Sequence, residues 1–219
     1  MSTAPRITLF HSPHTRSSGA LALLKELDAP HELRVLNMKA GEQRQPDYLA
    51  INPHGKVPAI LDGDTLVTEQ VAIFIHLADR FPKAGLAPAI DHPRRGAYLR
   101  WLAYYGSCFE PAIQDRYLKH APASPMESPY GDFDSMLSVL EAQLTKGRFL
   151  LGDTFSAADV LWGTALQWTM MFDLVPKRPV FVAYADRIAT RPASRQVAEQ
   201  DVAWAGGHEA VKKANAITA

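Results

Sequence analysis

The spacing of apolar residues changes once along this chain, at a proline-rich segment near its middle. Before Pro82, apolar runs of strand length alternate with helical patterns, whereas after Pro93 apolar residues recur only at helical spacing. A third proline lies between these two, and such a composition is typical of a connection. We therefore predict two domains, 1–82 and 94–219, joined by a linker over 83–93.

The first domain is predicted to be a small α/β domain. An apolar run at Ile7–Phe10 is followed by a loop and a helical pattern, and the next run, His31–Leu36, alternates apolar and polar residues as a half-buried strand does. The order is strand, helix, strand, connection, strand, strand, helix. The later elements are expected at 57–61, at 65–67 after a tight turn over 62–64, and at 69–81.

The second domain is predicted to be all-α. Helical patterns cover 94–120, 133–145, 157–172, 180–190 and 193–203. Three prolines between residues 121 and 131 indicate a loop between two of these helices. Residues 205–219 are small and polar, and we expect them to lie over the surface or to fray.

Charge and composition exclude several kinds of partner. Twenty-three basic residues balance twenty-three acidic ones, so no long-range field draws the chain to nucleic acid or to an anionic membrane. No segment approaches the roughly 20 apolar residues that span a bilayer, and residues 1–6 lack the apolar core of a secretory signal. The single cysteine, Cys108, cannot form an internal disulfide, which favours a reducing cytoplasm. The histidines lack metal-ligand spacing, so we expect a small-molecule partner and no metal.

A proline stands at the head of one predicted strand. Residues 52–60 read N-P-H-G-K-V-P-A-I, and proline is awkward in a central strand because it donates no ladder hydrogen bond. A cis Val57–Pro58 bond would explain it, and would turn the Val57 amide and carbonyl toward solvent, where an extended peptide ligand can pair with them. A trans proline on an edge strand fits the same pattern.

Thr68, Glu69 and Gln70 stand where a helix is predicted to begin. The unpaired amides of a helix start favour an anionic group, and the Glu69 carboxylate can pair with an ammonium group, so an α-amino acid head group suits both. The other interpretation is that Thr68 caps the helix and that the negative charge of Glu69 interacts favourably with the helix dipole.

The order and spacing of these segments resemble the cytosolic glutathione transferases. Residues 52–60 and then 62–77, D-G-D-T-L-V-T-E-Q-V-A-I-F-I-H-L, resemble the family's glutathione site, in which a cis-proline strand precedes an acidic residue and a serine. Residues 149–159, F-L-L-G-D-T-F-S-A-A-D, resemble its helix-capping box and hydrophobic staple. The resemblance implies a thioredoxin-like α/β N-terminal domain and an all-α C-terminal helical bundle.

The resemblance also implies glutathione as co-substrate and assigns its contacts. The main chain of Val57 would pair with the cysteinyl part, and Lys56 would meet the glycyl carboxylate. Glu69 and Gln70 would hold the γ-glutamyl end, although Gln70 replaces the family's serine. His54 is equally explained as a solvated loop residue. The residues implied are Ser12, His54, Lys56, Val57, Pro58, Glu69 and Gln70.

The chemistry needs a thiolate, because a thiol with a pKa near ~8.5 is only a few per cent ionised at pH 7. The loop 11–18, H-S-P-H-T-R-S-S, holds neither cysteine nor tyrosine to stabilise it. One alignment puts Arg16 where bacterial relatives carry cysteine, with Ser17 next, and another favours Thr15 or His14. We predict Ser17 first and Thr15 second as the activating residue, with Arg16 adding positive potential.

A helix N-cap is the other explanation of Ser17. We expect the rate enhancement to come from orienting the thiolate against the electrophile and from electrostatic stabilisation, rather than from a general base.

The second substrate is expected against an aromatic helix of the second domain. Tyr104, Tyr105 and Cys108 are the predicted pocket residues, while Trp101 is assigned to the core. Cys108 falls in mid-helix without a nearby histidine, so we interpret it as a packed thiol rather than a nucleophile.

The function implied is conjugation of the glutathione thiolate to hydrophobic electrophiles. A glutathione-dependent isomerase, dehalogenase or peroxidase would use the same thiolate. A non-catalytic glutathione-binding or stress-response module would suit the unusual Arg16 and Gln70. The resemblance further implies a symmetric homodimer.

Overall fold

A computed structural model describes residues 7–217, with side chains described up to residue 209. The predictions made for residues 1–6 and 218–219 lie outside that range. The chain divides into two compact units. One runs to Leu77 and resumes at Pro192, and the other is Ala78–Arg191.

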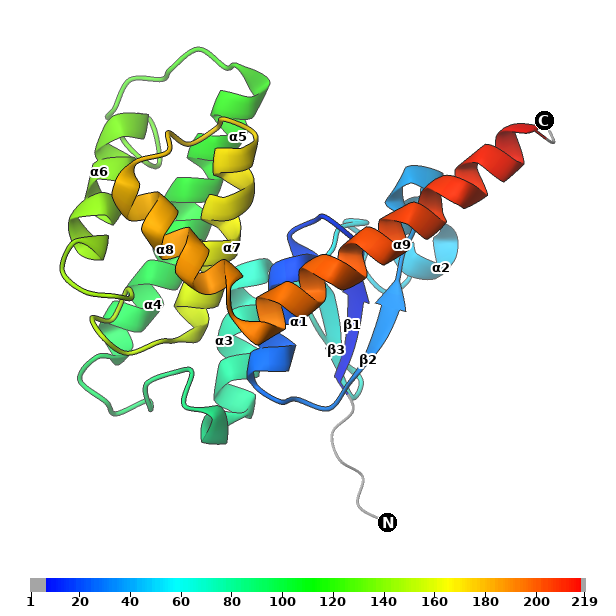
Figure 1. Ribbon diagram of the computed structural model, residues 1–219, viewed down its shortest axis with the longest axis horizontal. Helices are drawn as coiled ribbons and strands as arrows, with labels where there is room; N and C mark the ends of the chain where they lie inside the picture. Colours follow the sequence, from blue (N-terminus) through cyan, green and yellow to red (C-terminus); the bar gives the residue numbers. More distant parts are fainter. Residues whose placement is uncertain (1–6, 218–219) are drawn as a thin grey trace. The chain divides into compact units, whose positions relative to one another are not determined.

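The first unit is built on a four-stranded mixed sheet in the order β2-β1-β3-β4. β1 pairs with β2 in parallel and with β3 antiparallel, and β3 and β4 form a hairpin. This is the predicted α/β arrangement (Figure 1). The strands are β1 Ile7–His11, β2 His31–Val35, β3 Ala59–Asp62 and β4 Thr65–Val67, and the helices are α1 Ser17–Glu26, α2 Pro46–Leu49, α3 Gln70–Arg80 and α9 Pro192–Ile217.

The sheet carries apolar residues on both faces because adjacent side chains of a strand point to opposite sides. On β1, Leu9 and Phe10 are both buried. Phe10 packs with Ala59 of β3 and with Tyr48 of α2, whose ring centroid lies 5.4 Å from that of Phe10. α1 buries Leu23 and its neighbours and packs against β1. Two 3₁₀ turns, η1 Met38–Ala40 and η2 Glu42–Arg44, connect β2 to α2.

Two predictions in this unit are corrected. The third strand begins at Ala59 rather than at residue 57, so Pro58 precedes the ladder instead of opening it. The last helix, predicted over 193–203, continues to Ile217, where residues from 205 on were expected to lie over the surface or to fray. It packs along α1 within the first unit, as Figure 1 shows, whereas the sequence assigned it to the second domain. Burial of Val197 and an ion pair between Lys39 and Glu209, 2.5 Å from nitrogen to oxygen, hold it there.

The second unit is helical, as predicted (Figure 1). The helix expected over 94–120 is interrupted by a π turn, Tyr105–Phe109. Pro111 explains the interruption, because it has no amide to donate to the carbonyl four residues earlier. The helices are α4 Arg95–Tyr104, α5 Glu110–Leu118, α6 Phe133–Leu144, α7 Ala157–Met171 and α8 Pro179–Ala189, and a 3₁₀ turn, η3 Pro82–Ala84, lies in the predicted linker.

The capping box predicted at the start of α7 is confirmed. The Ser156 amide and hydroxyl both donate to Oδ2 of Asp159 at 2.8 Å, while its Oδ1 accepts from the Leu150 amide and the Tyr184 hydroxyl at 2.8 Å each. Burial raises the pKa of Asp159, and these hydrogen bonds only partly offset that effect. The Phe155 ring packs edge-on against Phe149, with 5.4 Å between ring centroids.

Candidate functional site

Three loops of the first unit meet at one end of the sheet. The register pairs Phe10 with Ala59, so the loop that leaves β1 after His11 lies beside the segment that enters β3 through Pro58. β3 also pairs Ile60 with Val67, which brings the start of α3 to the same end. The sheet register therefore gathers the predicted glutathione and catalytic segments, although about 50 residues separate them in sequence.

The segment before β3 is held in a fixed turn. The bond between Val57 and Pro58 is cis, which the resemblance implied and which excludes the trans proline that the residue pattern also allowed. The buried Asn52 side chain spans the turn: its Nδ2 donates to the Lys56 carbonyl at 2.9 Å, and its Oδ1 accepts from the His54 amide at 3.2 Å. Within residues 7–217, we find no hydrogen bond from the protein to the amide or carbonyl of Val57. A donor and an acceptor on one residue are thus open to a ligand.

Gly55 is required in this turn. Its φ is +57°, and a Cβ at this position would lie 2.7 Å from the Gln43 carbonyl oxygen. The Arg44 guanidinium donates to the His54 carbonyl at 3.2 Å and closes the turn against η2. The side chains of His54 and Lys56 remain exposed, so both are available to an anionic group.

The start of α3 presents Glu69 in a strained conformation. Its φ is +62°, which lies in the left-handed region. This conformation costs a residue with a side chain roughly 1–3 kcal/mol, and residues that adopt it occur most often at functional sites. The Glu69 side chain is exposed, and its carbonyl accepts the first helical bond, from Ile73 at 3.0 Å. Gln70 Nε2 donates to the Arg16 carbonyl at 3.0 Å, which ties α3 to the β1–α1 loop.

The β1–α1 loop encloses Ser17. This residue is fully buried and is the first of α1, so the N-cap is Arg16 rather than Ser17. Its Oγ accepts from the Ser12 amide at 3.0 Å and lies 2.7 Å from Thr15 Oγ1. Ser12 is buried and its carbonyl accepts from Thr15 Oγ1 at 2.7 Å. Among the three predicted catalytic residues, Thr15 and Arg16 are partly exposed and Ser17 is not.

Two residues behind this loop were missed by sequence reasoning. His11 is fully buried, with Nδ1 2.8 Å from Ser17 Oγ and Nε2 3.0 Å from Oδ1 of Asp201 in α9. Oδ2 of Asp201 accepts from the His14 amide at 3.0 Å and from Ser18 Oγ at 2.6 Å. Burial raises the pKa of Asp201, but these hydrogen bonds outweigh burial and leave the pKa below its usual value.

The predicted pocket residues lie in the second unit and differ in exposure. Tyr105 is 1% exposed, stacks on Phe109 and contacts the edge of Trp162, so it belongs to the core with Trp101. Tyr104 is half-buried, its hydroxyl donates to the Met136 carbonyl at 3.2 Å, and burial raises its pKa. Cys108 is half-buried in the π turn.

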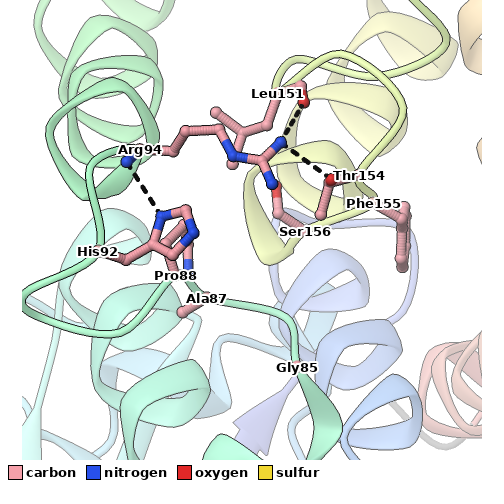
Figure 2. Close-up of a pocket in the computed structure, with 9 residues that line it drawn as sticks. All are labelled: Gly85, Ala87, Pro88, His92, Arg94, Leu151, Thr154, Phe155 and Ser156. Carbon is pink, nitrogen blue, oxygen red and sulfur yellow. Dashed lines mark hydrogen bonds between the residues drawn. The ribbon is translucent and has the colours of Figure 1, made fainter.

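A small cavity in the second unit does not involve these residues (Figure 2). Its volume is about 110 Å³. The Arg94 guanidinium beside it is already engaged, donating to the Leu151 carbonyl at 3.2 Å and to Thr154 Oγ1 at 3.0 Å. We assign this cavity to packing around the start of α7.

In the described part of the chain, no three histidine, cysteine or acidic side chains lie close enough together to hold a metal ion. None of the helices described is long and apolar enough to cross a membrane.

Comparison with known proteins agrees with this geometry. The family model for the glutathione S-transferase N-terminal domain matches residues 5–79, and that for the glutathione S-transferase C-terminal domain matches residues 130–187. Glutathione S-transferase 3 of Zea mays is 30% identical over 188 residues, which cover 78% of this chain and 83% of that protein. The disulfide-bond oxidoreductase YfcG of Escherichia coli is 28% identical over 205 residues, covering 87% of this chain and 93% of that protein.

A solved structure, that of a sphingomonad glutathione S-transferase complexed with glutathione, is 30% identical. It superposes with a TM-score of 0.73 and covers 89% of this chain and 98% of that chain. The sheet register, the cis bond before Pro58 and the matches to both domains lead to one conclusion. This chain belongs to the glutathione S-transferase family.

Proposed function

We propose that this glutathione transferase joins the sulfur of glutathione to small apolar electrophiles, with the β1–α1 loop stabilising the thiolate. The observation that carries the proposal is the open main chain of Val57, at the same end of the sheet as that loop and Glu69. An extended tripeptide can pair with one donor and one acceptor there while its two ends reach charged side chains.

We assign the ends of glutathione by charge. The γ-glutamyl ammonium group meets the exposed Glu69 carboxylate, and its carboxylate faces the start of α3, beside Gln70. The glycyl carboxylate lies toward the exposed Lys56, with His54 as a second cation when protonated. Ser12 and Pro58 are buried and contribute through their main chain and shape.

Thr15 is the residue we assign to the sulfur. Ser17 was ranked first from the sequence, but its hydroxyl is enclosed by the loop, whereas Thr15 is partly exposed. Lowering the thiol pKa by about two units requires roughly 2.7 kcal/mol, which is within reach of one charge-assisted hydrogen bond together with the dipole of α1. The cation of Arg16, the N-cap of α1, adds to the positive potential.

Ultraviolet difference spectroscopy tests this assignment, because a bound thiolate absorbs where the thiol does not. Titration of the wild type with glutathione at pH 7 should produce a thiolate band. Thr15→Val, which removes the hydroxyl at nearly constant volume, should abolish the band without abolishing binding, and Thr15→Ser should retain it. Glutathione binding with no band in the wild type would overturn the proposed function.

A relative that is a disulfide-bond oxidoreductase favours a second candidate, glutathione-dependent reduction of a disulfide. The protein's one cysteine, Cys108, lies in the second unit. The attacking thiol in such a reaction would therefore come from glutathione itself. Assays with an aryl halide and with a mixed disulfide, at equal glutathione, separate the two reactions.

For the electrophile we propose the half-buried Tyr104 and Cys108 as contacts, with Tyr105 supporting them from the core. We also propose a homodimer, which sedimentation would test. Because its co-substrate is a thiol and Cys108 has no internal disulfide partner, we place the enzyme in a reducing compartment such as the cytoplasm.

A further inference from the structure

A line of four polar side chains leads from the partly exposed Thr15 to a buried carboxylate. Thr15 Oγ1 lies 2.7 Å from Ser17 Oγ, and Ser17 Oγ lies 2.8 Å from His11 Nδ1. His11 Nε2 lies 3.0 Å from Oδ1 of Asp201. His11 and Ser17 are 0% exposed and Asp201 is 2% exposed, so only the Thr15 end can meet a ligand.

The carboxylate fixes the direction of these hydrogen bonds. Asp201 is held ionised by its donors, and a carboxylate only accepts, so the proton of a neutral imidazole sits on Nε2 of His11. Nδ1 is then an acceptor, and the hydroxyl that faces it is that of Ser17. When the Ser17 hydroxyl donates to His11, Ser17 Oγ can accept from the Thr15 hydroxyl. The Thr15 oxygen already accepts from the Ser17 amide at 3.2 Å and keeps one lone pair that can accept a proton.

We propose that this line is a proton relay, in which buried His11 is the base that receives the thiol proton of glutathione. The thiol gives its proton to Thr15 Oγ1, the Thr15 proton passes to Ser17 Oγ, and the Ser17 proton passes to His11 Nδ1. In total, one S–H bond is broken and one N–H bond is formed, and no atom is oxidised or reduced. The products are a thiolate that accepts a hydrogen bond from Thr15 and an imidazolium paired with Asp201.

This inference rests on the proposed function, which puts the sulfur at Thr15, and it adds a base that sequence reasoning did not invoke. The surroundings of His11 suit that role. Its ring packs edge-on against Trp204, with 5.3 Å between ring centroids, and this contact shields the pair from water. His14 also faces the pair: its Nδ1 lies 3.9 Å from Oδ2 of Asp201, and its side chain is 57% exposed.

The relay competes with one other acceptor. This acceptor is the Ser12 carbonyl oxygen, which lies 2.7 Å from Thr15 Oγ1, the same distance as Ser17 Oγ, and 3.1 Å from Ser17 Oγ. The Thr15 hydroxyl can therefore turn from one acceptor to the other without movement of heavy atoms. Asp201 also holds the His14 amide and Ser18, so substitutions of Asp201 disturb the loop as well as the base. The test is therefore made at His11.

The test uses His11→Asn and His11→Gln, which keep hydrogen-bonding atoms but cannot take up a proton near neutral pH. We expect both variants to bind glutathione within about threefold of the wild type, and the thiolate fraction at pH 7 to fall at least about tenfold, which is one unit in the pKa of the bound thiol. His120→Asn is the control, because His120 is an exposed histidine of the second unit with no contact to the four side chains of the relay, and it should change neither quantity.

A second measurement needs no substitution. In the wild type, the ring-nitrogen NMR signals of His11 should move to the imidazolium position when glutathione binds, and should stay neutral with S-methylglutathione, which has no thiol proton. A wild-type thiolate band that persists in both His11 variants, or a His11 ring that stays neutral beside bound thiolate, would overturn the relay alone. Absence of the band from the wild type would overturn the proposed function instead.

Discussion

Nε2 of His11 lies 3.0 Å from Oδ1 of Asp201, across 190 residues of sequence. The contact joins the last residue of the first strand to the last helix, and the other oxygen of the same carboxylate holds the backbone of His14. One buried side chain of α9 thus organises the loop that carries the candidate catalytic residues. This contact explains why α9 belongs with the sheet rather than with the helical unit.

We predict that Asp201→Asn makes stability less dependent on pH. Because the folded-state pKa of Asp201 is lowered, its contribution is present above the unfolded value of about 3.9 and is lost as pH falls through the folded value. Urea denaturation at pH 7 should show a loss of about 2 kcal/mol in the variant, shrinking below about pH 4. Asp91→Asn, at an exposed residue, should match the wild type throughout. A constant difference between Asp201→Asn and wild type down to pH 3 would contradict this linkage.

Gly55→Ala should weaken both folding and glutathione binding. The added Cβ would meet the Gln43 carbonyl at 2.7 Å in a backbone of φ +57°, so the turn that presents Val57 must shift. Gly41→Ala provides the control, since its φ is +80° but nothing lies within 4 Å of its Cβ. We expect a loss of about 1 kcal/mol in Gly41→Ala and at least twice that in Gly55→Ala. Thermal unfolding and calorimetric titration with glutathione would measure the two effects, and equal losses in the two variants would exclude the steric argument.

The sequence was informative wherever a local pattern has a local cause. The strand predicted over His31–Leu36, the turn at Gly63 and the pairing of Ser156 with Asp159 depend on neighbours within a few residues. The structure contains each of them, although the strand ends at Val35 and its burial does not alternate. The cis bond at Pro58 did not follow from the local pattern, which also fits a trans proline; the resemblance to the family implied it.

Long-range contacts could not be predicted in this way. Helical periodicity shows that one face of 193–203 is apolar, but it does not say which element covers that face, so Asp201 gave no signal. Ser17 and Tyr105 were predicted as site residues from their residue types. Both are buried by segments distant in sequence, and this burial decides whether a ligand can reach them. The π turn before Pro111 is an exception, because its cause is local: proline cannot make one helical hydrogen bond, and helical periodicity alone did not indicate the turn.

Asp159→Ala is expected to lower the free energy of unfolding of the protein strongly. It would leave the Leu150 amide, the Ser156 amide and the Tyr184 hydroxyl without their buried acceptor. Unsatisfied buried donors cost about 1–3 kcal/mol each, so a total loss of at least about 3 kcal/mol is expected. Urea denaturation followed by circular dichroism measures it, with Asp153→Ala, at an exposed residue in the preceding turn, as the control. A loss below 1 kcal/mol would show that other groups replace the carboxylate.

Lys56→Met should lower the affinity for glutathione only when the glycyl carboxylate is charged. The Lys56 side chain is exposed, and an ion pair in such a position contributes about 0.5–1 kcal/mol, which corresponds to a loss of roughly twofold to fivefold in affinity. Calorimetric titration should therefore find this loss with glutathione but not with its glycyl ethyl ester, and added salt should reduce it. Lys83→Met, an equally exposed lysine in the linker, should bind both ligands like the wild type. If the ester loses as much affinity as glutathione in Lys56→Met, then Lys56 acts by shaping the turn before Val57 rather than by pairing with the glycyl end.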